Sequence, residues 1–213
     1  MTRRIRPWEA MARIAERRAI TIVRATDRAT GLDRCRRLIE AGADVIEVSF
    51  TTPDAAALIA ELVEAAGSTA LVGAGTVLDG ATARAAVDAG AQFLLAPGLA
   101  PEMVRAGQRA GVAVIPAAQT ATEAMVAMEH GASAVKLFPA STVGIAGMQA
   151  ITEALPQVPF IPTGGIELDT AQAWLDAGAV AVGLGGATAR ADPAELREIL
   201  AGLAAGGPAG GGS

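Results

Sequence analysis

Eight short apolar segments, rich in β-branched residues, recur along this chain at intervals of roughly 20 to 26 residues. They lack the polar alternation of a half-exposed sheet, so they predict strands that are buried on both faces. Segments with helical spacing of apolar residues lie between them, for example at 30–41 and 54–65. Eight strand–helix units of this length predict an α/β protein with the (β/α)8 TIM-barrel architecture. The predicted strands are residues 19–24, 45–50, 70–75, 93–96, 113–116, 134–138, 160–163 and 180–183.

The stretches outside these units predict one extra helix and one tail. Residues 8–16 precede the first strand and predict an N-terminal helix that covers the bottom of the barrel, and we expect the six arginines within residues 3–18 on its solvated face. Residues 205–213 are dominated by glycine, so we expect a disordered tail after a single barrel domain of residues 1–204. A doubly wound open sheet is the alternative architecture for the same alternation.

The composition restricts the partners of the chain. A net charge of −5, 3% aromatic residues and the lack of an extended basic stripe argue against nucleic acid. No apolar run reaches the roughly 20 residues that span a bilayer, so we expect no membrane partner. Cys35 is the only cysteine, which excludes an intramolecular disulfide and fits a cytoplasmic protein. With 52% hydrophobic residues, the chain predicts a large core, an oligomer interface, or both.

Lys136 is the only lysine among the 17 lysine and arginine residues, and it lies in the sixth predicted strand. The C-terminal ends of barrel strands and the loops after them build the active site. A desolvated lysine can lose its proton and condense with a ketone to form an iminium ion, whereas arginine cannot. Lys136 is therefore the first catalytic candidate, and a snorkelling or ion-paired structural lysine is the alternative.

Glu47 is a carboxylate inside the second predicted strand. Strand alternation puts Val45, Glu47 and Ser49 on one face, which in a barrel is the interior. A buried carboxyl group can exchange protons near neutral pH, so Glu47 is a candidate general acid and base. The alternative is a structural partner for a buried cation, and the two roles are compatible.

Other strand ends carry groups suited to an anionic ligand. Arg24 ends the first strand and could hold a carboxylate in a bidentate contact, unless it is merely exposed. Thr76 offers a hydroxyl after the third strand. Glycine-rich turns after strands seven and eight are common phosphate sites in barrels, although such turns also occur without a ligand. These turns contain Thr163, Gly164 and Gly165, then Gly185 and Gly186.

Five segments together resemble the 2-keto-3-deoxy-6-phosphogluconate and 4-hydroxy-2-oxoglutarate aldolase family. They are residues 46–55, 72–79, 91–99, 135–141 and 160–166. The resemblance implies a class I aldolase that reversibly cleaves a 2-keto-3-deoxy-6-phospho sugar acid, with 2-dehydro-3-deoxy-6-phosphogluconate favoured, to pyruvate and glyceraldehyde 3-phosphate. Alternative substrates are 4-hydroxy-2-oxoglutarate and 2-keto-3-deoxy-6-phosphogalactonate. It also implies no metal, no cofactor beyond a covalent Schiff base with the keto acid substrate, and a homotrimer.

The resemblance also implies roles for single residues. Lys136 matches the Schiff-base lysine and Glu47 the general acid and base. Arg24 and Thr76 match residues at the substrate carboxylate, and Phe138 matches an aromatic residue that lines the pocket. Thr163, Gly164 and Gly165 match the loop at the phosphate end, which Gly185 and Gly186 complete.

Three positions depart from the pattern of this family. Ala117 stands where a glycine is usual, Thr51 where some relatives carry arginine, and Gly186 where a serine usually contacts the phosphate. Thr188 is expected to compensate for that serine. Two other functions stay open at this point: a phosphate-binding barrel isomerase or synthase, and a non-catalytic or engineered trimeric assembly scaffold.

Overall fold

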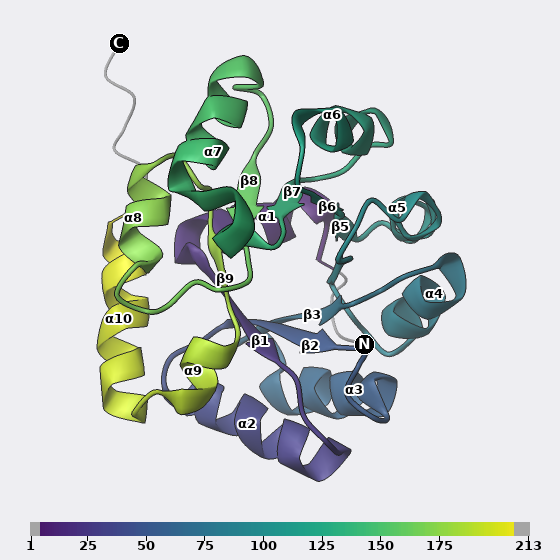
Figure 1. Ribbon diagram of the computed structural model, residues 1–213. Coiled ribbons are helices and arrows are strands. Elements are labelled where there is room, and N and C mark those ends of the chain that lie inside the picture. Colours follow the sequence, from purple (N-terminus) through teal and green to yellow (C-terminus); the bar gives the residue numbers. More distant parts are fainter. Residues whose placement is uncertain (1–4, 207–213) are drawn as a thin grey trace.

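The computed structural model describes residues 5–206 of the chain (Figure 1). The tail predicted for residues 205–213 lies, from residue 207 onward, outside the described residues. The strands are β1 (Ala19–Val23), β2 (Val45–Ser49), β3 (Leu71–Gly75), β4 (Phe93–Leu95), β5 (Ala113–Ile115), β6 (Ala117–Ala118), β7 (Val135–Leu137), β8 (Phe160–Pro162) and β9 (Val182–Leu184). The helices are α1 (Pro7–Arg17), α2 (Arg28–Glu40), α3 (Ala55–Ala66), α4 (Gly80–Asp88), α5 (Pro101–Ala110), α6 (Ala121–Glu129), α7 (Ala140–Ala154), α8 (Ala171–Asp176), α9 (Gly186–Arg190) and α10 (Pro193–Ala205).

The strands form two parallel sheets that follow one another around a common centre. The larger sheet has the order β5-β4-β3-β2-β1-β9, and the smaller has the order β6-β7-β8. Helices alternate with the strands and lie on the outside of the curved sheets (Figure 1). Each crossover between consecutive strands of one sheet contains a helix, the usual connection between parallel strands. The predicted α/β barrel-like fold is confirmed.

Most strand boundaries lie within one residue of the sequence prediction, and the fifth and eighth strands differ more. The fifth predicted strand, residues 113–116, ends one residue early as β5, and the structure adds a short strand, β6, after Pro116, which has no N–H to donate to a ladder. Its carbonyl still accepts a hydrogen bond from the Lys136 amide at 2.9 Å. The last strand begins at Val182, two residues later than predicted, and the short helix α9 follows it directly. The sequence analysis did not predict α9.

An apolar layer closes the N-terminal end of the strands. Ala10 and Ile14 of α1 are fully buried in a cluster with inward-facing strand residues. Burial of an isoleucine side chain stabilises a fold by about 1.5–3 kcal/mol, so α1 is an integral part of the core. Polar side chains occupy the same strand face two residues further along several strands, as the alternation of strand side chains requires. The cluster residues on the strands are Ile20, Val45, Leu71, Phe93, Leu95, Ala113, Ile115, Ala134, Ile161 and Ala181.

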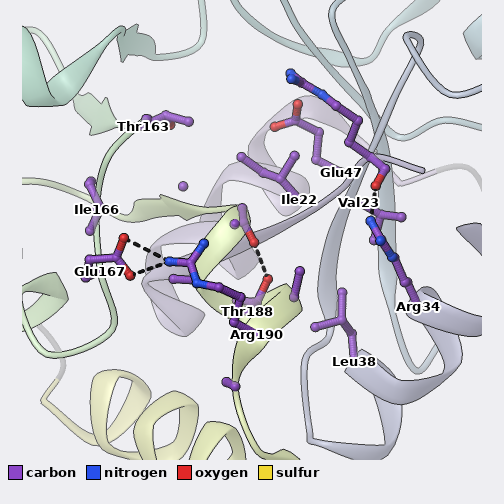
Figure 2. Close-up of a pocket in the computed structure, with 18 of the residues that line it drawn as sticks. Ile22, Val23, Arg34, Leu38, Glu47, Thr163, Ile166, Glu167, Thr188 and Arg190 are labelled. Carbon is purple, nitrogen blue, oxygen red and sulfur yellow. Dashed lines mark hydrogen bonds and ion pairs between the residues drawn. The ribbon is translucent and has the colours of Figure 1, made fainter. Parts of the chain in front are cut away.

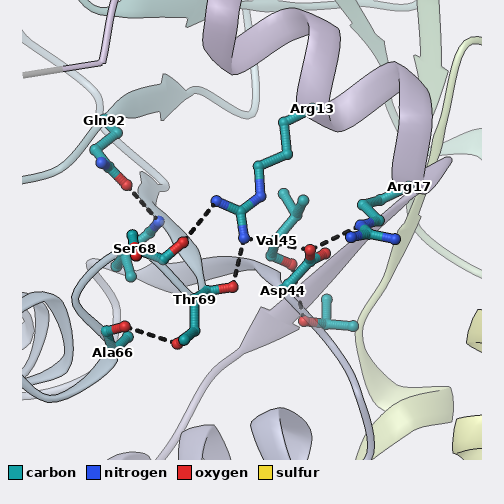
Figure 3. Close-up of polar contacts among 10 residues, drawn as sticks. Arg13, Arg17, Asp44, Val45, Ala66, Ser68, Thr69 and Gln92 are labelled. Atoms are coloured by element: carbon teal, nitrogen blue, oxygen red, sulfur yellow. Dashed lines mark hydrogen bonds and ion pairs between the residues drawn. The ribbon is translucent and has the colours of Figure 1, made fainter.

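Arginines in the second half of α1 hold this helix to the segments before β2 and β3 (Figure 3). Arg13 and Arg17 both pair with Asp44, at 3.2 and 2.7 Å. Arg13 also donates to the carbonyl of Ser68 at 3.1 Å and to that of Thr69. Arg18 is only 7% exposed and donates to backbone carbonyls at the end of α10. The expectation of a solvated face is therefore wrong for Arg13 and Arg18, because backbone carbonyls and Asp44 attract their guanidinium groups.

Asp79 begins α4 as its N-cap and gives the fold a testable dependence on pH. Its side chain accepts a hydrogen bond from the Thr82 amide at 2.7 Å. This backbone bond, helped by the Thr82 hydroxyl, lowers the pKa of Asp79 below its ordinary value. A lowered folded-state pKa means that the contribution to stability is present above the unfolded-state pKa of about 4 and is lost as the pH falls through the folded-state pKa.

Asp79→Asn keeps an oxygen acceptor at the N-cap but removes the titration. We therefore expect the stability of the unchanged chain, relative to this variant, to fall between about pH 5 and pH 2. Urea unfolding of both proteins at a series of pH values measures the difference. A difference that stays constant over this range would contradict the assignment.

Candidate active site

A cavity of about 730 Å³ lies among the C-terminal ends of the strands and the loops that follow them. Figure 2 shows Glu47 on one side of it, and Glu167 with Arg190 on the other. The structure brings every site residue of the sequence prediction to its wall. These residues are Arg24, Glu47, Thr76, Lys136, Phe138, Thr163, Gly164, Gly165, Gly185 and Gly186.

Lys136 and Glu47 form a buried pair at the base of this cavity. The Nζ atom of Lys136 lies 4.0 Å from Oε1 of Glu47, and the side chains are 6% and 2% exposed. Nζ also lies 5.1 Å from the centroid of the Phe138 ring, within the range of a cation–π contact. Charged groups are rarely buried this deeply unless they are paired with an opposite charge. Here Lys136 and Glu47 are each other's partners.

The second carboxylate oxygen of Glu47 is free to bind a ligand. Among the buried side-chain atoms of residues 5–206, Oε2 of Glu47 has no hydrogen-bond partner. A buried oxygen without a partner costs roughly 1–3 kcal/mol, and such atoms are uncommon in folded proteins. A water molecule or a substrate hydroxyl would satisfy it.

Two glycines make room for the polar groups of the pocket. A Cβ atom at Gly75 would lie 1.6 Å from Oε1 of Glu47, and one at Gly183 would lie 2.2 Å from the Thr163 hydroxyl oxygen. The sequence analysis did not predict this steric role. The available signal was a glycine inside a predicted strand, which often marks a close approach of another group.

A chain of three hydroxyl groups reaches the cavity wall at Thr76, after the third strand. The Ser49 hydroxyl lies 2.8 Å from that of Thr51 and 2.9 Å from that of Thr76. Thr76 adopts a φ of 57°, which is uncommon outside glycine and turns its side chain toward Ser49. Thr51, which stands where some relatives carry arginine, thus takes part in a network that the sequence did not predict.

Arg24 follows β1 and is exposed at the mouth of the cavity. Arg34 of α2 also lines the cavity, and it donates a hydrogen bond to the Arg24 carbonyl. This bond fixes the backbone that carries Arg24 and adds a second guanidinium to the same wall. The sequence analysis missed Arg34, because a helical residue facing the strand ends has no distinct sequence signal.

The loops after β8 and β9 form the other end of the cavity. Gly164 and Gly165 have φ values of 92° and 78°, which only glycine adopts without strain. Thr188, expected to replace a serine, donates its hydroxyl to the Gly185 carbonyl at 2.8 Å. The hydroxyl proton of Thr188 is therefore engaged by a backbone carbonyl of the same loop.

Cys35 lies on the core side of α2 and away from the cavity wall. Burial raises the pKa of its thiol to about 12, so the thiol stays protonated and unreactive at neutral pH. Among residues 5–206, no three or more histidine, cysteine, aspartate or glutamate residues cluster as a metal site would require. Within the same range, no helix combines the length and the apolar character needed to cross a bilayer.

Comparison with known proteins agrees with this geometry. A model of the KDPG and KHG aldolase family matches residues 11–200. The chain is 35% identical over 167 residues to the 2-dehydro-3-deoxy-6-phosphogalactonate aldolase of Escherichia coli, which covers 78% of this chain and 82% of that protein. It is 39% identical over 163 residues to the 2-dehydro-3-deoxy-phosphogluconate aldolase of Treponema pallidum, with 76% of each chain covered.

A solved structure of the same family is also similar. It is the KDPG aldolase of Legionella pneumophila with pyruvate captured as a covalent carbinolamine intermediate. The TM-score is 0.79 at 29% identity, over 91% of this chain and 97% of that one. From the family match and these relatives, the chain belongs to the KDPG and KHG aldolase family and is an aldolase, a carbon–carbon lyase.

Proposed function

We propose that the chain is a class I aldolase that reversibly cleaves a 2-keto-3-deoxy-6-phospho sugar acid through a Schiff base on Lys136. The observation that carries the proposal is the buried pair of Lys136 and Glu47, 4.0 Å apart in a cavity at the strand ends. The carbinolamine in the Legionella relative supports the same covalent chemistry. This chemistry needs no cofactor, because the iminium ion itself withdraws electrons from the breaking bond.

In the proposed mechanism, the Lys136 amine attacks the C2 ketone of the substrate, and loss of water leaves an iminium ion. Glu47, directly or through a water molecule at Oε2, supplies and removes the protons of these steps. The carboxylate then accepts the proton of the C4 hydroxyl, and the C3–C4 bond breaks with its electron pair moving toward the iminium nitrogen. The aldehyde departs, the resulting enamine is protonated at C3, and hydrolysis releases pyruvate and the free amine.

The remaining wall residues suit the two ends of such a substrate. Arg24 and Thr76 line the cavity, and we expect them to hold the carboxylate next to the ketone; Phe138 lines the pocket beside Lys136. The glycine-rich loops at Thr163, Gly164 and Gly165, and at Gly185 and Gly186, line the cavity as well, and we expect them to face the aldehyde half. We favour 2-dehydro-3-deoxy-6-phosphogluconate as the substrate; 2-keto-3-deoxy-6-phosphogalactonate and 4-hydroxy-2-oxoglutarate are the alternatives.

Pyruvate and sodium borohydride test the covalent step directly. We expect reduction to leave one adduct per chain, heavier than the protein by the mass of pyruvic acid minus one oxygen atom. Intact-protein mass spectrometry measures it, and borohydride without pyruvate is the control. A protein that gains no mass would refute the Schiff base. A coupled assay of pyruvate release from the three substrates then ranks them, and release from none would favour the assembly scaffold.

We also infer a closed eight-stranded barrel and a homotrimer. Closure is supported by the parallel bridge between Thr163 and Gly183, which joins the two sheets on one side, and by the succession of β5 and β6 on the other. Large exposed side chains at Trp8, Leu78 and Met125 suit subunit contacts. Light scattering of the purified protein measures the oligomer. The single-domain boundary and the cytoplasmic location stay predictions.

A further inference from the structure

An ion pair joins the two loops at the end of the cavity away from Glu47 (Figure 2). Nη2 of Arg190, the last residue of α9, lies 2.8 and 3.0 Å from the two carboxylate oxygens of Glu167. Glu167 follows the glycine turn after β8, whereas Arg190 follows the one after β9. Both side chains are more than half exposed and both line the cavity that contains Lys136.

The guanidinium of Arg190 lies next to Gly186, so a side chain at position 186 would press against it. A Cβ atom at Gly186 would lie 3.0 Å from Nη1 of Arg190. Only Nη2 is used by Glu167, and within residues 5–206 no hydrogen bond engages Nη1. Glycine at 186 therefore leaves an unused, positively charged donor group over the loop backbone.

We propose that Arg190 binds the anionic group on the aldehyde half of the substrate, with Nη1 as the donor, while Glu167 contacts only Nη2. This inference rests on the proposed aldolase function. Gly186 has no side chain to offer, and the Thr188 hydroxyl proton is held by the Gly185 carbonyl. The planar guanidinium suits the oxygens of a phosphate or a carboxylate. Arg190 thus determines specificity and takes no part in bond cleavage.

Comparing the removal of Arg190 with the removal of Glu167 distinguishes a binding role of Arg190 from a merely structural one. If the ion pair only ties the two loops together, removal of either partner has the same effect on every substrate. If Arg190 binds an anion, the two removals differ, because Glu167 is a negative charge that repels the substrate anion. Loss of the arginine then weakens binding of an anionic substrate, whereas loss of the carboxylate does not.

The test compares Arg190→Gln, Glu167→Gln and a control, Arg84→Gln, which breaks an exposed pair with Asp88 on α4. Substrates are the 6-phospho sugar acid, its dephosphorylated form, and 4-hydroxy-2-oxoglutarate, whose terminal anion is a carboxylate. In Arg190→Gln we expect KM for the phosphorylated substrate to rise about 10-fold, the low end for a charged hydrogen bond at an exposed site. The ratio of kcat/KM between the phosphorylated and dephosphorylated substrates should fall by a similar factor of about 10.

Glu167→Gln should leave KM for the phosphorylated substrate unchanged or lower it, and Arg84→Gln should change neither constant. A KM rise for 4-hydroxy-2-oxoglutarate as well would assign the site to both kinds of anion; a rise for the phosphate ester alone would assign it to phosphate. Inorganic phosphate as a competitive inhibitor gives a second measurement, with a Ki about 10-fold higher in Arg190→Gln.

Equal losses in the Arg190 and Glu167 variants on all substrates would overturn the proposal, and so would an unchanged KM and Ki in Arg190→Gln. Pyruvate trapping by the unchanged chain separates this failure from that of the proposed function. A chain that traps pyruvate but shows no selective effect of Arg190 refutes the anion site alone. A chain that traps no pyruvate refutes the Schiff-base mechanism itself.

Discussion

Replacing Lys136 with arginine should lower kcat/KM at least about 10⁴-fold and abolish the pyruvate adduct, because a guanidinium stays protonated and cannot form an imine. The substitution keeps a positive charge beside the buried Glu47 carboxylate, 4.0 Å away in the unchanged chain. The fold should therefore survive, and loss of activity would report on chemistry. Steady-state assays of pyruvate release and mass spectrometry after borohydride measure the two effects.

Lys136→Met is the informative comparison for Lys136→Arg. It removes the amine and the charge together, so Glu47 is left buried without its cation. Breaking a buried ion pair in this way costs about 3–5 kcal/mol of stability, which urea unfolding would detect. An arginine variant that still releases pyruvate at an appreciable rate, or that still gains mass, would show that the imine forms elsewhere.

Gly75→Ala should reduce turnover by about 100-fold or more, although the change adds only one methyl group. The new Cβ would lie 1.6 Å from Oε1 and 2.4 Å from Cδ of Glu47, so the carboxylate must leave its position beside Lys136. A displacement of about 1 Å in a proton-transfer group can cost two orders of magnitude in rate. The kcat of the variant in the pyruvate-release assay measures this loss.

Two further variants show whether Gly75 acts through Glu47. Glu47→Gln should itself lower kcat by about 10²- to 10⁴-fold, the usual range for a general acid and base. If the alanine acts by moving Glu47, the double variant should be no slower than the slower single variant. Gly202→Ala is the matched control, because a Cβ there meets no atom within 4 Å. Additive losses in the double variant would mean that the alanine disturbs something else.

The fold was predictable because burial in this architecture is periodic. Strands such as β2 and β3 are buried along their whole length, so their apolar runs stand out from the helices between them. The points at which strands and helices begin and end were less predictable. The sequence prediction ends the fifth strand at Pro116 and misses the two-residue strand β6 after it, and α9 contains alanine and glycine with little amphipathic pattern. Hydrogen-bond geometry, which the sequence does not state, determines both.

The site was predictable where a residue is unusual for its surroundings. A charge in an apolar strand is costly, so Lys136 and Glu47 could be identified without a structure. Arg34, Glu167 and Arg190 could not, because exposed charges on helices and loops are ordinary and their position at the cavity depends on packing between distant segments. The contact of Gly75 with Glu47 likewise joins residues on neighbouring strands.

Because Lys136 is the only lysine in the chain, cleavage by a protease can also measure the fraction of active sites that carry an adduct. A lysine-specific protease has one cleavage site in the sequence and would divide the unfolded chain into residues 1–136 and 137–213. A lysine that has been alkylated by reduction of its imine is no longer a substrate for such a protease. The fraction of chain that stays uncut after denaturation would therefore equal the fraction of sites that held a carbonyl compound when the borohydride was added. A gel measures it as the band of the whole chain against the bands of the two fragments.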